Sequence, residues 1–208
     1  VPQLIRNPHD RADLANDVEE YLDTVIGTDA MPEDDWVRAK TYWWLADLFY
    51  FDRLLQLPLA LLEAEHGIPV RAGIEHVAAS AAPTIAGVVG RLVEHARAIQ
   101  RGGPEFVGEP AWGGLLWPAD QHALIDLVLG GALDAFYEEA ADELAALAPD
   151  DETAVREAVE LNRALLRVPS APPRMLVVSH DLCAHHEAWL SGEPVPLGER
   201  LAAYALKG

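Results

Sequence analysis

Residues 43–62 constrain the fold more than any other segment, because apolar side chains occupy almost all of these positions. The segment is about as long as a membrane-spanning helix. However, Asp47, Asp52 and Arg53 lie inside it, and each charge near the centre of a bilayer costs about 2.5–3.5 kcal/mol. We therefore expect a helix that is buried within a protein rather than within a membrane.

This helix has a clear predicted start and end. Pro32 fixes φ for a first turn, and the three acidic residues that follow it suit the positive end of the helix dipole. Apolar residues then lie on nearly every face, which is typical of a helix that is covered on most sides. Pro58 removes a backbone hydrogen bond, so we expect a kink or an end there. Residues 59–65 are expected to continue as a helix that Gly67 closes.

The rest of the chain predicts more helices with short joins and a single strand. Residues 175–178 (Met-Leu-Val-Val) form the one convincing strand, and because a lone strand is not stable in water, we expect it to pair with a distant segment or with another chain. The expected fold class is thus mainly all-α, a multi-helix domain with one short strand near the C-terminus. The further helices are expected at 71–79, 83–101, 118–129, 132–148, 151–166, 181–190 and 197–206.

The composition limits the function classes. The chain has 34 Asp and Glu against 15 Lys and Arg, which gives a net charge of −19. Neither nucleic acid nor an anionic membrane surface is an expected partner, since both require basic residues. The single cysteine, Cys183, excludes an internal disulfide and an all-cysteine metal or cluster site. The first residues show no signal-peptide pattern, and we expect a cytoplasmic location.

Three polar residues inside the apolar helix, Asp52, Arg53 and Gln56, are candidates for function. A buried charge requires a partner, so we expect Asp52 and Arg53 to be partly buried and hydrogen-bonded. One interpretation is an internal network that fixes helix packing. The other is that these side chains face a cavity with aromatic walls.

A histidine-rich segment near the C-terminus is a candidate metal site. Asp181 and His185 are spaced i,i+4, so that one helix face could present both to a metal ion, with His180 and His186 nearby. A zinc site requires one or two more ligands, which the sequence does not show. The alternative is a solvated helix start. The chain contains no nucleophile elbow, phosphate loop or dinucleotide fingerprint.

Several blocks of sequence together resemble the C-terminal region of cobalamin-binding radical S-adenosylmethionine (SAM) proteins. The blocks are DWVRA (35–39), FDRLLQLPL (51–59), WPADQ (117–121), GALDAFYEEA (131–140), SHDL (179–182) and GEPVPL (192–197). The resemblance extends from about residue 7 to residue 197. It lies in the combination of blocks rather than in any single one.

Proteins of this family join an N-terminal cobalamin-binding domain to a radical SAM barrel, where three cysteines bind a [4Fe–4S] cluster. They commonly methylate unactivated carbon or phosphorus centres, and one branch acts on the indole of tryptophan. This chain has one cysteine and no cobalamin-binding fold, so it resembles the helical C-terminal part alone. A chain that begins at Val1 rather than Met is also expected to be a piece of a longer one.

The resemblance implies that residues 1–208 cap the barrel and line the substrate pocket of an enzyme that methylates an unactivated carbon, with an indole- or tryptophan-type acceptor as one candidate. Cobalamin, S-adenosylmethionine and the [4Fe–4S] cluster are implied for upstream domains of the same polypeptide, and none is expected to bind this chain alone. We expect no catalytic residue and no metal ligand here. The expected substrate-binding residues are Tyr42, Trp44, Phe49, Gln56 and Trp117, which ordinary core packing could also explain.

Two other functions stay open. The first is a free-standing acidic helical interaction protein without an active site. The second is a small metal-dependent helical enzyme that uses His180, His185 and His186.

Overall fold

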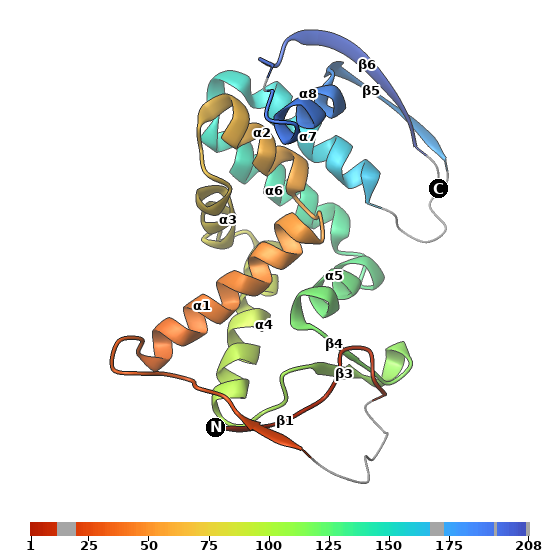
Figure 1. The fold of residues 1–208 in the computed structure, drawn as a ribbon. Coiled ribbons are helices and arrows are strands. Elements are labelled where there is room, and N and C mark those ends of the chain that lie inside the picture. Colours follow the sequence, from red (N-terminus) through yellow and green to blue (C-terminus); the bar gives the residue numbers. More distant parts are fainter. Residues whose placement is uncertain (12–19, 167–172, 194, 207–208) are drawn as a thin grey trace.

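Helices dominate the computed structural model, which describes residues 1–11, 20–166, 173–193 and 195–206 (Figure 1). The expected fold class, a mainly α multi-helix domain, is confirmed over this part of the chain. A π-helix, η1 (Asp47–Phe51), follows the first α-helix, and two short 3₁₀ turns are η2 (Pro110–Trp112) and η3 (Pro149–Asp151). The α-helices are α1 (Glu33–Ala46), α2 (Gln56–His66), α3 (Val70–Ala78), α4 (Pro83–Gln100), α5 (Ala119–Leu129), α6 (Leu133–Leu147), α7 (Glu152–Leu165) and α8 (Leu182–Leu190).

The described strands form three antiparallel pairs. These are β1 (Pro2–Leu4) with β2 (Tyr21–Asp23), β3 (Val107–Glu109) with β4 (Leu115–Trp117), and β5 (Arg174–His180) with β6 (Glu199–Leu206). The predicted strand at 175–178 lies within β5, and its partner β6 follows α8 in the sequence, so the expected pairing with a non-adjacent segment is confirmed. The other strands were not predicted.

The prediction of a helix at 197–206 is wrong, because most of this segment forms the strand β6. Leu176 pairs with Tyr204, and Val178 pairs with Ala202, on the face of the ribbon that is turned toward the helices. Strand pairing overrides the helix propensity of the alanines and leucines here. Figure 1 shows the two strands as a long ribbon outside α7 and α8.

The predicted break of the long helix occurs, but earlier than Pro58. The α-helix α1 continues into the wider π-helical turn η1, and residues 52–55 separate η1 from α2. Pro58 is the third residue of α2. In the first turn of a helix, an amide has no intrahelical partner to lose, so a proline is tolerated there.

The core lies where η1 and α2 meet α6 and α7. The rings of Phe49 and Phe136 are 5.9 Å apart, and both side chains are fully buried. Leucines from the break and from α2 surround them, among them Leu54, Leu55 and Leu59. In the described part of the chain, no single helix has the length and apolar character to cross a membrane, although α3 and α4, bent by 99°, pass that test as a pair.

A carboxylate from α6 completes the N-terminus of α4. The Glu139 carboxylate accepts hydrogen bonds from the backbone N–H of Thr84 at 3.0 Å and of Ile85 at 2.9 Å, and from the Thr84 hydroxyl at 2.8 Å. Burial alone would raise the pKa of Glu139, but these hydrogen bonds lower it below its ordinary value. Glu139 therefore ties α4 to α6 in its ionised form.

Candidate functional site

A buried asparagine holds the break between η1 and α2. The Asn162 side chain of α7 is 3% exposed, and its Oδ1 accepts the Leu57 backbone N–H at 2.9 Å. Its Nδ2 donates to the carbonyl oxygens of Arg53 at 2.9 Å and of Leu54 at 2.7 Å. One side chain thus satisfies three backbone groups that the interrupted helix leaves without partners.

The backbone at the break is strained. Arg53 has a φ of +64°, a left-handed conformation that residues other than glycine rarely adopt. Such strain persists only where the surrounding structure imposes it, and it is concentrated at functional sites, as are π-helical turns. The hydrogen bond from Asn162 to the Arg53 carbonyl oxygen supplies part of that constraint.

An open cleft of about 660 Å³ lies beside this break, and we call it the helix-break cleft. The Arg53 side chain is exposed at the cleft, and it makes no ion pair within the described part of the chain. Burial lowers the pKa of His186 and raises the pKa of Cys183, so both side chains are held in their neutral forms. The lining residues are Asp52, Arg53, Gln56, Leu57, Asn162, Leu165, Leu166, Cys183, His186, Glu187 and Leu190.

Asp52 connects the helix-break cleft to a group of carboxyls beneath it. One of its oxygens, Oδ2, is buried and has no hydrogen-bond partner among the described residues. The pKa of Asp52 is raised to about 6. Burial is the largest cause, and the charge of Asp120, a hydrogen bond to Asp120 and the charge of Asp47 add to it. Asp120, in the first turn of α5, is 6% exposed, and burial raises its pKa as well. The two carboxyls therefore hold a proton between them more readily than isolated carboxyls do.

The expectation for Asp52 and Arg53 is only partly met. Asp52 is partly buried, as predicted, but its contact is with Asp120 rather than with an arginine. The expectation that Arg53 is buried is wrong. Because the helix ends at residue 51, Arg53 lies on the outside of the break instead of inside a continuous apolar helix.

The structure places the five predicted substrate-binding residues in different surroundings. Gln56 lines the helix-break cleft, whereas Tyr42 lines a second cleft between α1, α3 and α4. Trp44 and Phe49 are buried in the core. Trp117 ends β4, where its ring centre lies 5.2 Å from that of His9, and its buried Nε1 has no hydrogen-bond partner in the part of the chain that the structure describes.

The histidines of the candidate metal site have separate partners. His180 Nδ1 lies 2.7 Å from Glu157 Oε2 of α7, and His185 Nε2 lies 2.7 Å from Glu65 Oε1 of α2. Across the described residues, no three His, Cys, Asp or Glu side chains are arranged to hold a metal ion. The two histidine–carboxylate pairs instead attach β5 and α8 to the helices beneath them.

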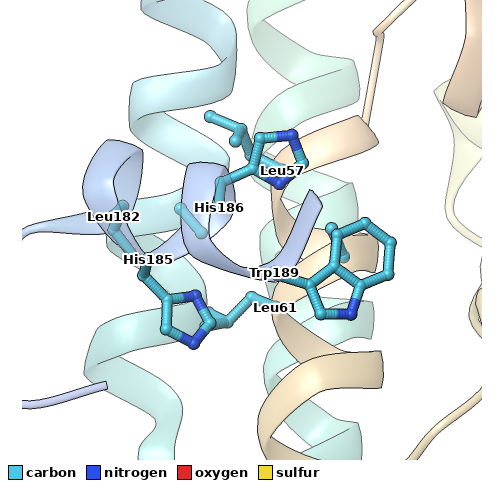
Figure 2. Close-up of a pocket in the computed structure, with 8 residues that line it drawn as sticks. Leu57, Leu61, Leu182, His185, His186 and Trp189 are labelled. Atoms are coloured by element: carbon cyan, nitrogen blue, oxygen red, sulfur yellow. The ribbon is translucent and has the colours of Figure 1, made fainter. Parts of the chain in front are cut away.

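Figure 2 shows a small cavity where α8 packs on α2. His185 and His186 point in different directions from α8, and Trp189 lies beside α2. The cavity holds about 10 Å³, which is room for about one water molecule. It is therefore a packing defect, and the larger helix-break cleft, which His186 also lines, is the candidate site.

Sequence reasoning missed the contribution of α7 and α8 to this cleft. One signal was available: Val155, Val159 and Leu166 form an apolar stripe at helical spacing, and Asn162 occupies a position within it. A polar residue at such a position requires a buried partner. His186 attracted attention only as a candidate metal ligand, and Cys183 and Glu187 carried no comparable signal, because the fold alone brings α8 to the break.

Comparison of the chain with family models and with curated proteins gave no match.

Proposed function

We propose that this chain is the C-terminal helical domain of a cobalamin-dependent radical SAM methyltransferase, and that the helix-break cleft forms part of its methyl-acceptor pocket. One observation carries this proposal. The resembling block at 51–59 coincides with the strained, Asn162-held break at which Asp52, Arg53 and Gln56 line a cleft. Cobalamin, S-adenosylmethionine and the cluster belong to upstream domains in this proposal, and the present chain orients the acceptor.

The chemistry of the helix-break cleft suits an acceptor that has both charged and apolar parts. The Arg53 guanidinium, which has no ion-pair partner among the described residues, can bind a carboxylate, and Asp52 and Glu187 can bind an ammonium group. Leu57, Leu165 and the other leucines of the lining offer an apolar wall for a ring or chain. An amino acid with an indole side chain is one molecule of this kind.

The rim of the cleft also favours a covering neighbour. Leu165 and Leu190 line it and are 48% and 64% exposed, and Phe51, which precedes Asp52, is 69% exposed. Large apolar side chains that are exposed around one cleft are typical of an interaction surface. In the proposal, the radical SAM barrel covers this surface and closes the pocket against water.

The test is Arg53→Gln in the complete enzyme, with Arg101→Gln as the matched control. Arg101 is exposed at the end of α4 and lies outside the cleft. Loss of a charge-assisted hydrogen bond weakens binding by about 1.5–3 kcal/mol, so we expect Arg53→Gln to raise the KM for the acceptor at least tenfold. The melting temperature and the control enzyme should be unaffected. An unchanged KM in Arg53→Gln would contradict the proposed role of the cleft.

A free-standing interaction protein is the second candidate, and the β5–β6 ribbon favours it. Met175, Val177 and Leu201 are 63%, 58% and 77% exposed on its outer face, which presents apolar surface away from the helices. The size of the native polypeptide separates the two candidates. A chain that starts near residue 1 would support the interaction protein, and a much longer chain would support the methyltransferase domain.

A further inference from the structure

The outer strand of the C-terminal ribbon, β6, has one edge that no other strand of the described structure covers. The ribbon contains two strands, so β6 pairs with β5 along one edge, and among the described residues its backbone makes no further hydrogen bond. Figure 1 shows β6 on the outside of the molecule. The residues from Glu199 to Leu206 therefore present a row of free backbone N–H and C=O groups.

Most of β6 lacks the features by which edge strands avoid pairing with other chains. Such strands carry charged side chains, prolines or bulges. In β6 these features are limited to its first residues, where Glu199 and Arg200 lie beside an irregularity in the pairing with β5. From Leu201 to Leu206 the strand contains no charged residue and no proline. This part of β6 is therefore suited to pairing with another strand.

Charge limits which surfaces two copies of this chain can bring together. With a net charge of −19, two copies repel each other overall. The ribbon is a favourable place for contact, because residues 201–206 are uncharged and the ends of the ribbon carry Arg174 and Arg200 as well as Glu199. A second copy can therefore approach the β6 edge without bringing acidic side chains face to face.

The sequence of β6 is also complementary to itself. A strand can pair with its own copy in antiparallel orientation about a two-fold axis, provided that side chains of one face stay on that face. With the axis at Ala203, Leu201 lies opposite Ala205 of the second copy on the outer face. On the inner face, Tyr204 lies opposite Ala202 of the second copy. Each of these pairs joins a large side chain to a small one, so the two strands fit without crowding.

This pairing also continues the apolar rows of the ribbon. Met175 of β5 pairs with Ala205 of β6, so Leu201 of the second copy extends the same row on the outer face. Met175 and Leu201 are 63% and 77% exposed in the single chain, and each gains an apolar neighbour along this row. The joined sheet has the strand order β5–β6–β6–β5, and sheets of three or more strands are more stable than a two-stranded ribbon.

We propose that β6 is a dimerisation edge, at which two copies of this chain pair in antiparallel orientation about a two-fold axis at Ala203 and form a continuous four-stranded sheet. An edge contact of this length is smaller than a standard interface of about 1,600 Å², so the dimer is weak and reversible. The proposal is independent of the methyltransferase assignment, because β6 does not line the helix-break cleft and the pairing requires no cofactor.

The first experiment measures the mass of the 208-residue chain by sedimentation equilibrium in about 0.5 M sodium chloride, which screens the repulsion between acidic copies. The average mass should rise from 22.7 kDa toward twice that value as the protein concentration increases from about 10 μM to about 1 mM. Ala203→Lys should stay at 22.7 kDa, because two lysines would face each other across the axis and like charges directly opposite destabilise strand pairing. Val177→Lys is the matched control. Val177 is 58% exposed on the same face but belongs to β5, so this variant should associate as the original chain does.

Cross-linking tests the register and does not depend on the stability of a lysine variant. At the axis, the Cα atoms of the two copies of residue 203 should be about 4.5–5.5 Å apart, which is within the range of a disulfide. Ala203→Cys should therefore oxidise to a linked dimer at concentrations where the original chain associates. The two copies of Val177 would lie three strand spacings apart, about 14 Å, so Val177→Cys should stay unlinked. The original chain, whose one cysteine is Cys183, controls for linking through that thiol.

Three results would overturn the proposal. The first is a mass that stays at 22.7 kDa up to about 1 mM. The second is an Ala203→Lys variant that associates as the original chain does. The third is loss of association in Val177→Lys or ready cross-linking of Val177→Cys, which would show that the outer faces of two ribbons pack on each other instead of the β6 edges pairing.

Discussion

Replacement of Asp52 by asparagine should stabilise the protein at neutral pH and have little effect in acid. Burial, followed by contact with Asp120, raises the pKa of Asp52 from an ordinary 3.8 to about 6. The folded state therefore binds this proton more tightly than the unfolded state does. Its contribution is fully present below about pH 4 and is lost as the pH rises through about 6. Asparagine cannot ionise, so the variant avoids this loss.

The magnitude follows from the size of the pKa change. A rise from 3.8 to about 6 corresponds to about 3 kcal/mol. Because Asp52 lies at the edge of an open cleft, solvent screening reduces this value, and we expect Asp52→Asn to gain about 1–2 kcal/mol at pH 8. Asparagine can still donate a hydrogen bond to Asp120, so the shape of the contact is kept.

The assay is urea unfolding followed by tryptophan fluorescence at pH values from 4 to 8. The control is Asp150→Asn in η3, where the side chain is exposed and a change should alter stability by less than about 0.5 kcal/mol. The difference between Asp52→Asn and the original chain should grow with pH and level off above pH 7. A difference that is constant with pH, or a variant that is less stable at pH 8, would refute the carboxyl pair.

Two further substitutions test contacts that hold the fold. Asn162→Ala leaves the Leu57 N–H and the carbonyls of Arg53 and Leu54 without their side-chain partner. Each such group costs about 1–3 kcal/mol, so we expect urea unfolding to show a stability loss of about 3–5 kcal/mol. A loss under about 1 kcal/mol would contradict this role of Asn162. Glu139→Gln should cost about 1 kcal/mol at pH 7, since a charged acceptor at the start of α4 is lost. Because the pKa of Glu139 is lowered, its stabilisation is present above the ordinary pKa of a glutamate and is lost as the pH falls. The cost of Glu139→Gln in thermal unfolding should therefore shrink toward pH 3, and a cost that is independent of pH would contradict the assignment.

Local patterns predicted most helices but not the pairing of segments. Helical periodicity located α3, α4, α6 and α7, which have apolar stripes, and Pro118 and Gly130 located the ends of α5. The segment 199–206 has the composition of a helix, and only its partner β5 makes it a strand. Local propensity cannot express a preference that depends on a neighbour 20 or more residues away.

The helix-break cleft shows the same limit at the candidate site. Asp52, Arg53 and Gln56 attracted attention because they interrupt an apolar run, and all three line the helix-break cleft. The sequence could not show that the ladder widens into η1 before residue 52, which turns Arg53 outward. Nor could it show that Asp120 approaches Asp52, since that contact depends on how α5 packs against η1.

The size and cofactor content of the native polypeptide test the central claim most directly. An antibody against residues 1–208 should detect a polypeptide much larger than 22.7 kDa in the source cells. When this polypeptide is purified without oxygen, it should contain iron, sulfide and cobalt in amounts that match a cluster and a cobalamin. A native protein of 22.7 kDa that contains neither would contradict the claim that this chain is the C-terminal domain of a cobalamin-dependent radical SAM methyltransferase.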